Sequence, residues 1–297
     1  MLAKSRSEGI FKSLATFALT IEADSFNLQM KARTETWNSS DPYEYFMGRW
    51  SQKMTPVFLE WLNAPDHLSW LDLGCGTGAL SEAIYRNCNP AKLSCIDPSI
   101  EFLEKAKAKL SGNGDFDVGS ASAIPKANDT FDIVVSGLAL NFFPDLSIAF
   151  SEMKRVLKKN GIIAAYVWDY AGRMDFLRLF WDTACELDPA ARKLDEGIRF
   201  PICNADNLRS AFQEAGLRNI ETSQLDIDTV FKNFDDYWDP FLGGQGPAPG
   251  YLSSLNKNLQ EEIKTAVHEK LEIQQDGSIK LLARAIGVRG KWKSMIF

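Results

Sequence analysis

The stretch Trp70-Leu-Asp-Leu-Gly-Cys-Gly-Thr-Gly78 decides the fold of this chain. It starts as a short apolar run, which predicts a buried strand over 68–73, and continues into a turn with three glycines. A glycine adopts positive φ easily and lets a ligand approach the backbone. A predicted helix over 78–87 follows at once, so its free N–H groups point toward the turn. We therefore expect a polar ligand at the carboxyl end of this strand, where open α/β sheets bind cofactors.

A second predicted strand, 92–97, ends in an acidic residue. Asp97 lies 25 residues after Asp72, close to the offset of about 20 residues at which a carboxylate meets ribose hydroxyls in nucleotide-binding folds. A carboxylate accepts from two neighbouring hydroxyls at once, so the two features together indicate an adenosine-containing cofactor. Dinucleotide sites use the spacing G-x-G-x-x-G, whereas here the third glycine comes one residue early.

The form Leu71-Asp-Leu-Gly-Cys-Gly-Thr-Gly78 resembles the first motif of the class I S-adenosylmethionine-dependent methyltransferases. The resemblance continues through Asp97-Pro98-Ser99, 131–136 and 149–157, and covers roughly residues 40 to 230. Within that family the chain looks like the small-molecule branch that includes ubiquinone and menaquinone C-methyltransferases. The resemblance implies an α/β fold: a doubly wound, mainly parallel, seven-stranded Rossmann-like sheet with an antiparallel last strand and a helical cap insert. It also implies S-adenosylmethionine as the cofactor.

The resemblance further implies a set of cofactor contacts at the carboxyl ends of the strands. These are Asp72, Gly74, Cys75, Gly76, Asp97, Pro98, Ser99, Ser120, Ala121, Ser136 and Leu138. The glycines would lie against the methionine portion of the cofactor, and Asp97 would take the ribose hydroxyls. Many relatives carry an acidic residue where this chain has Ser120, so a hydroxyl would replace a carboxylate beside the adenine.

The segment Tyr43-Glu-Tyr-Phe-Met-Gly-Arg-Trp50 is unusually rich in aromatic residues. It would either pack on the sheet as a helix or close over the cofactor, with Arg49 meeting the cofactor carboxylate in a charge-assisted pair. Asp41-Pro42 predicts the start of a helix. Pro56 predicts that the helical stretch is divided into two pieces.

The rest of the chain alternates strands and helices, which predicts a parallel sheet with both faces covered. Further strands are expected at 115–119, 131–136, 161–168, 218–230 and 279–288, and helices at 99–110, 145–157, 176–187, 204–215 and 252–273. We interpret 1–36 as an N-terminal extension and 37–297 as a methyltransferase domain with a cap insert at about 231–275. The stretch Gly243–Gly250 would be either an exposed connection or the hinge of a lid.

The methyl acceptor is expected beyond the strand ends, beneath the insert. Aromatic residues gather in the segments 141–143, 168–170, 237–239 and at Phe241. Asp169 and Asp239 are candidate bases, and Tyr170 is a candidate for orienting the acceptor. The aromatics would equally serve to pack the cap, and Asp169 would equally satisfy a turn.

Composition narrows the class of protein. The net charge is −6 over 297 residues, which argues against a nucleic-acid partner. Five dispersed cysteines and two histidines form no metal-binding spacing, so no metal is expected. No apolar run is long enough to span a membrane. We therefore expect a cytoplasmic monomer or homodimer acting on a small molecule.

Two other functions stay open at this point. A nicotinamide-dependent oxidoreductase is disfavoured by the glycine spacing and by the lack of a catalytic Tyr/Lys or His arrangement. A non-catalytic module that binds S-adenosylmethionine would share the cofactor site but would not need Asp169 or Asp239.

Overall fold

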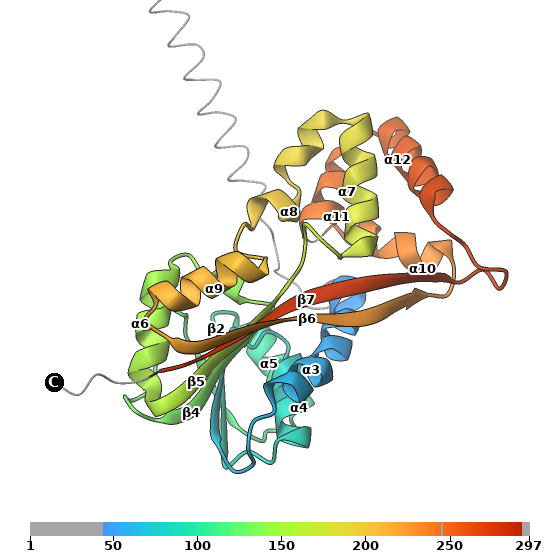
Figure 1. Ribbon diagram of the computed structural model, residues 1–297. Coiled ribbons are helices and arrows are strands. Elements are labelled where there is room, and N and C mark those ends of the chain that lie inside the picture. Colours follow the sequence, from blue (N-terminus) through green and yellow to red (C-terminus); the bar gives the residue numbers. More distant parts are fainter. Residues whose placement is uncertain (1–43, 245, 293–297) are drawn as a thin grey trace, which may run out of the picture.

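The computed structural model describes residues 44–244 and 246–292, which build a seven-stranded sheet (Figure 1). In space the strands follow the order β3-β2-β1-β4-β5-β7-β6. They are β1 (Ser69–Leu73), β2 (Lys92–Asp97), β3 (Asp115–Val118), β4 (Phe131–Gly137), β5 (Leu157–Trp168), β6 (Arg218–Phe231) and β7 (Ile279–Lys291). Strands β1 to β5 pair in parallel, and β7 runs antiparallel to both β5 and β6. The predicted fold class is confirmed.

Helices cover both faces of the sheet. On one face α4 (Ala79–Asn87) contacts its neighbours α3 (Arg49–Leu62) and α5 (Ile100–Lys109), while α6 (Leu146–Val156) and α9 (Ala205–Glu214) pack on β5 to β7. The central strands are therefore apolar on both sides. Ile133, Val134 and Val135 are all fully buried, as the continuous apolar run predicts.

Polar side chains fix where the helices begin. Ser99 accepts from the Phe102 N–H at 3.3 Å, and Asp145 accepts from the Ile148 N–H at 3.0 Å. Asn204 caps α9 in the same way. Each cap satisfies an N–H group that the helix itself leaves unpaired. The predicted helix starts at 99, 145 and 204 are confirmed.

A separate group of helices lies beyond the sheet, on the side where the long strand β6 ends and the long strand β7 begins (Figure 1). The chain between β6 and β7 forms four of its elements, which we call the cap. They are α10 (Phe234–Trp238), η4 (Asp239–Gly243), α11 (Pro247–Ser254) and α12 (Lys257–Lys270). The cap packs on α7 (Asp175–Leu187), which continues into η3 (Pro189–Lys193) and α8 (Glu196–Arg199). The short elements η1 (Glu44–Gly48) and η2 (Leu140–Phe142) complete the described fold.

One predicted helix and the predicted connection at 243–250 differ from what is observed. The single helix expected at 252–273 is two helices, because Leu255 is extended and Asn256 caps α12 by accepting from the Leu259 N–H at 3.0 Å. The start of α11 at Pro247 also makes the second half of the glycine-rich stretch 243–250 helical.

The predicted break at Pro56 is wrong, because α3 runs unbroken through this residue. A proline in a helix leaves the carbonyl four residues earlier without its usual donor. Here that carbonyl belongs to Gln52, and it accepts a hydrogen bond from the Thr55 hydroxyl at 3.0 Å.

Strand β5 also begins earlier than expected, at Leu157 rather than 161.

Some predictions fall outside the described residues, namely the extension 1–36 and the helix start at Asp41-Pro42. Within the described residues, none of the helices combines the length and the apolar character needed to cross a bilayer.

Gly78 provides a test of how tightly α4 and α5 pack. Its φ is +83°, and a Cβ there would lie 2.9 Å from the Cα and Cβ of Ala106 in α5. Gly112 has a similar φ of +77°, but no described atom lies within 4 Å of its Cβ position. We expect Gly112→Ala to lower the free energy of unfolding by about 1–2 kcal/mol through backbone strain, and Gly78→Ala by about 3 kcal/mol or more because a clash is added. Urea denaturation measures both, and equal losses would contradict the close packing.

Candidate active site

The turn between β1 and α4 is held against the neighbouring strand β2. The N–H groups of Gly74 and Cys75 both donate to the Ile96 carbonyl, at 2.8 and 3.1 Å. Gly74 has φ +74°, and a Cβ there would lie 2.7 Å from that of Ala139. Gly76 has φ +53°, and its Cβ position lies in open space among the described residues. The turn therefore packs tightly at Gly74 and presents bare backbone to a cavity at Gly76.

Asp97 is fixed at the end of β2 by two backbone donors. The Gly76 N–H donates to Oδ2 at 2.9 Å, and the Ser99 N–H donates to Oδ1 at 2.8 Å. Burial raises the pKa of Asp97 above its ordinary value, and the two N–H groups offset only part of that effect. Each carboxylate oxygen can accept a second hydrogen bond. The side chain is thus oriented to receive two hydroxyls of a ligand.

Asp72, near the end of β1, lines the same cavity as Asp97 and is almost fully buried. The Ser81 hydroxyl donates to its Oδ2 at 2.5 Å, and its Oδ1 has no partner among the described residues. Burial, with a smaller contribution from the charge of Asp97, raises the pKa of Asp72 to about 7. A buried acceptor without a donor is costly, so Oδ1 is a place for a donor from a ligand.

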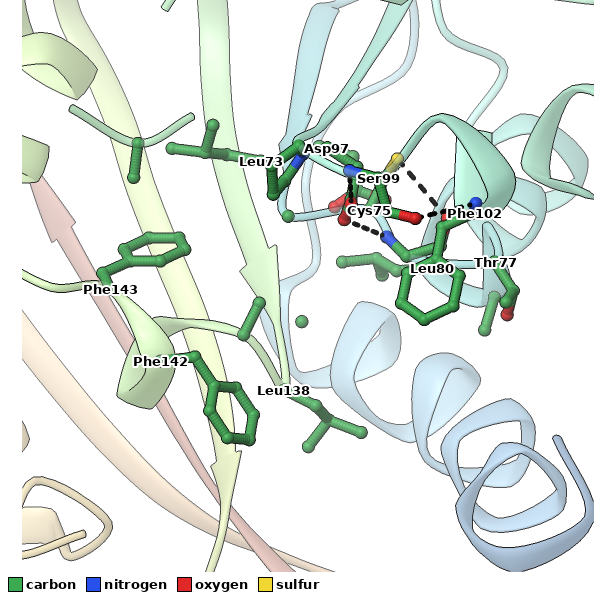
Figure 2. Close-up of a pocket in the computed structure, with 18 of the residues that line it drawn as sticks. Leu73, Cys75, Thr77, Leu80, Asp97, Ser99, Phe102, Leu138, Phe142 and Phe143 are labelled. Carbon is green, nitrogen blue, oxygen red and sulfur yellow. Dashed lines mark hydrogen bonds between the residues drawn. The ribbon is translucent and has the colours of Figure 1, made fainter. Parts of the chain in front are cut away.

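These groups line a cavity of about 550 Å³, a volume typical of small-molecule sites. Its walls come from the carboxyl ends of β1, β2, β4 and β5 and from the first residues of α3. Figure 2 shows Cys75, Asp97 and Ser99 grouped on one side and Leu138 and Phe142 apart from them. The cavity therefore has a polar end at the glycine turn and an apolar, aromatic end at η2.

Most of the residues implied by the resemblance line this cavity. They are Asp72, Gly74, Cys75, Gly76, Asp97, Pro98, Ser99, Ser120, Ala121 and Leu138. Ser136 is not among the described lining residues, because it is fully buried within β4 and Gly137 takes the place at the cavity wall. Its hydroxyl has no partner in the described part of the chain.

Arg49 is also absent from the described lining residues, and its guanidinium is engaged elsewhere. It donates to the Asp236 side chain at 2.8 Å and to the Asp236 carbonyl at 3.1 Å. Its Cζ lies 4.4 Å from the ring centre of Trp50 and 4.8 Å from that of Phe231. The structure therefore places the Arg49 side chain, at the start of α3, against the cap. This geometry agrees with the first interpretation of the segment, packing as a helix, and Arg49 as a contact of the cofactor carboxylate stays a prediction.

The three residues suggested for catalysis do not come together. Asp169 accepts from the N–H groups of Gly172 and Arg173, at 3.0 and 3.3 Å, and thereby closes a turn. Asp239 is exposed in η4. Neither is among the described lining residues, whereas Tyr170 is. The alternative reading of Asp169 as a turn residue agrees with this geometry.

Several lining residues were not identified from the sequence. Met47 and Ser51 reach the cavity from η1 and α3, and Phe102 and Tyr166 from α5 and β5. Met47 lies in the aromatic-rich segment 43–50, which was a signal for it, and Ser51 directly follows that segment. Phe102 and Tyr166 carried no signal, because their sequence positions match ordinary core residues.

The comparisons with known proteins agree with this geometry. A family model described as "Methyltransferase domain" matches residues 71–165. The chain is 33% identical over 117 residues to 2-methyl-6-phytyl-1,4-hydroquinone methyltransferase 1 of Oryza sativa subsp. japonica, an alignment that covers 39% of this chain and 36% of that protein. The chain thus spans only about a third of the rice protein.

A longer match is to the malonyl-[acyl-carrier protein] O-methyltransferase of Acetivibrio thermocellus, 28% identical over 238 residues, covering 74% of this chain and 77% of that protein. Among solved structures, the chain resembles phosphoethanolamine N-methyltransferase 2 of Haemonchus contortus, determined in complex with phosphomonomethylethanolamine and S-adenosylhomocysteine. The TM-score is 0.53 at 14% identity, over 85% of this chain and 56% of that one. At this identity the similarity concerns the fold.

The pKa of Asp72 predicts a pH dependence of stability. Its value rises from 3.8 to about 7 in the folded protein, so the native state holds a proton that the unfolded state releases. The contribution of Asp72 to the free energy of unfolding is complete below about pH 4. It is lost as the pH rises toward 7, by about 2–3 kcal/mol between pH 5 and 7. We expect Asp72→Asn to remove this contribution from the pH dependence of the free energy of unfolding, measured by urea denaturation at several pH values. Asp115→Asn, which changes an exposed ion-paired carboxylate in β3, serves as the control. An identical pH dependence of the free energy of unfolding in the wild type and in Asp72→Asn would refute the assignment.

Arg49, the first residue of α3, and Arg289, in β7, can be compared because each forms an ion pair and a cation–π contact that involves α3. Arg289 donates to the Leu62 carbonyl at 2.8 Å and lies 5.2 Å from the ring centre of Trp61. We expect Arg49→Met and Arg289→Met each to lower the free energy of unfolding by about 1–2 kcal/mol, since each loses an ion pair and a cation–π contact. Only Arg49→Met should speed hydrogen exchange in residues 44–51, because only Arg49 ties that segment to the cap. Equal exchange in the two variants would show that Arg49 has no such role.

Proposed function

We propose that this chain, whose residues 71–165 match a model described as a methyltransferase domain, is a class I S-adenosylmethionine-dependent methyltransferase that transfers the methyl group of S-adenosylmethionine to a small organic acceptor. The observation that carries the proposal is the arrangement of Asp97. Two backbone N–H groups, one from the glycine turn and one from the start of α5, orient its carboxylate toward a cavity large enough for a nucleoside.

The residues present suit this cofactor. Asp97 would hold the two ribose hydroxyls, and the open space at Gly76 would admit the methionine portion. The unpartnered Oδ1 of Asp72 would accept from the amino group. Ser120 and Ala121 would flank the adenine. When bound, S-adenosylmethionine supplies a methyl group made electrophilic by the positive charge on sulfur.

The protein's own part in the reaction is to position the reactants and to exclude water. Leu138, Phe142 and Phe143 form an apolar wall, and Trp168 and Tyr170 stand at the end of β5. Aromatic faces attract a positively charged sulfur, and a dry wall keeps water from competing for the methyl group. Tyr170 would orient the acceptor through its hydroxyl, while the Asp169 and Asp239 side chains are engaged or exposed elsewhere.

The aromatic walls favour an acceptor that itself carries a ring, as in the hydroquinone methyltransferase of rice, or an apolar polyketide-like molecule. In this proposal the cap and η1 together close the acceptor side of the cavity. The family match gives no support to a nicotinamide-dependent oxidoreductase or to a non-catalytic binding module. The division into an extension 1–36 and a catalytic domain 37–297 with its insert at 231–275 remains part of the proposal, as does assembly as a monomer or homodimer.

Calorimetry with S-adenosylhomocysteine tests the cofactor site. We expect micromolar binding by the wild type and an affinity at least about tenfold weaker for Asp97→Asn, because one charge-assisted hydrogen bond is worth roughly 1.5–3 kcal/mol. Asp115→Asn removes the same charge from the start of β3, beside Lys92, and should bind as the wild type does. Absence of binding by the wild type, or unchanged binding by Asp97→Asn, would end the proposal.

A further inference from the structure

Trp168 is the last residue of β5, lines the cavity of the candidate active site and is 2% exposed. In the sheet, β4 separates β5 from β1, which leads into the glycine turn. Neighbouring strands lie about 4.7–4.9 Å apart, so the end of β5 is roughly 10 Å from the end of β1. The carboxylates of Asp72 and Asp97 come from β1 and β2. Trp168 therefore lies toward the acceptor end of the cavity, away from the acids assigned to the cofactor.

The indole N–H of Trp168 differs from those of three other buried tryptophans. The indole N–H groups of Trp50 and Trp70 are sealed among protein atoms without a partner in the described part of the chain. The indole N–H of Trp181 donates to Glu196. That of Trp168 also has no partner among the described residues, but it keeps accessible surface. Because Trp168 forms part of the cavity wall, this donor faces the cavity.

The backbone on both sides holds Trp168 in place. Its strand lies between β4 and β7, and Trp168 pairs with Ala285 of β7. The next residue, Asp169, donates its N–H to the Arg284 carbonyl at 2.9 Å. A side chain on such a rigid strand presents its donor in a fixed direction, which is what a specific binding site needs. The position of the indole N–H is thus set before a ligand enters.

This donor constrains what a ligand can bring to the wall. An indole N–H donates one hydrogen bond and accepts none. A ligand that fills the cavity removes water from the N–H group, and a donor left without water or a partner is costly. A hydrocarbon edge against Trp168 would leave the donor in that state. A ligand with a hydrogen-bond acceptor atom at this place would satisfy it.

The charges of the cavity indicate which acceptor atom fits. The described lining residues include the carboxylates of Asp72 and Asp97 but no lysine, arginine or histidine. A carboxylate or phosphate group beside Trp168 would therefore lose its water without gaining a cationic side chain from these residues. A ketone or phenolic oxygen carries no full charge and loses much less. An uncharged oxygen on a ring suits both the donor and the aromatic walls.

We propose that the indole N–H of Trp168 positions the methyl acceptor, and that this acceptor is an uncharged ring compound with a ketone or phenolic oxygen. Trp168 then determines specificity, because a ring of the same shape without the oxygen leaves the buried donor unpaired. This inference rests on the proposed function, since it names the substrate class of the same site.

Two probes of nearly the same shape test the inference, 1-tetralone with a ring ketone and tetralin without it. The protein is ¹⁵N-labelled and saturated with S-adenosylhomocysteine, and the indole N–H signal of Trp168 is assigned through the Trp168 backbone. We expect 1-tetralone to move this signal downfield, because the N–H gains an acceptor. Tetralin brings the same aromatic ring without the acceptor and should not produce the downfield shift. This comparison needs no variant.

Affinity in a variant gives an independent measurement. We expect Trp168→Phe to lower the ratio of 1-tetralone affinity to tetralin affinity about three- to tenfold, the range of one neutral hydrogen bond. Trp61→Phe makes the same change in α3, at a residue absent from the described lining residues, and should keep the wild-type ratio. Titrations followed by the protein NMR signals measure the affinities of all three proteins.

The contrary outcomes are distinct. No downfield shift with 1-tetralone, an equal shift with tetralin, or an unchanged affinity ratio in Trp168→Phe would overturn the role of Trp168. Binding of S-adenosylhomocysteine without any binding of 1-tetralone would also overturn it while leaving the methyltransferase proposal intact. Failure of S-adenosylhomocysteine to bind would instead overturn the proposed function.

Discussion

The site depends on the two backbone hydrogen bonds that hold the Asp97 carboxylate. One donor, Gly76, belongs to the turn after β1, and the other, Ser99, opens α5 after β2. The parallel register of β1 and β2, in which Leu73 pairs with Ile96, brings these two chain segments together. The sheet itself therefore sets the orientation of the carboxylate before any ligand arrives. A preorganised acceptor of this kind binds without a cost of reordering.

The wall opposite this polar end depends on long-range contacts. Phe46 of η1 packs against Phe241 of the cap with ring centres 5.2 Å apart, and Trp50 packs against Phe231 at 5.1 Å. Arg49 joins the same two parts by its ion pair with Asp236. Met47 lies within this segment and lines the cavity of about 550 Å³. The position of the acceptor wall is thus coupled to the packing of the cap.

The polar end of the cavity depends on local sequence and the opposite wall on long-range contacts. This contrast explains which residues of the site could be predicted from the sequence. Asp97 and the glycines lie within a few residues of strand ends, and parallel strand ends meet at one edge of a sheet, so local sequence determines their location. Arg49 has its partner 187 residues away, and no local pattern reveals such a pair. At Pro56 the prediction failed because a neighbouring threonine hydroxyl replaces the missing donor. The short segments that decide where Asp169 and Asp239 point are likewise settled by turn geometry and cap packing, not by residue type.

The buried carboxylates of the site also affect which ligand it favours. Burial raises the pKa of both Asp72 and Asp97, because the hydrogen bonds that they accept offset only part of the cost of burying their charge. A cation beside them offsets the remaining cost, and in our proposal the amino group of the methionine portion is the cation that lies beside Asp72. The burial that makes these two acids costly to ionise therefore favours a ligand that brings a positive charge to Asp72 and hydrogen-bond donors to Asp97.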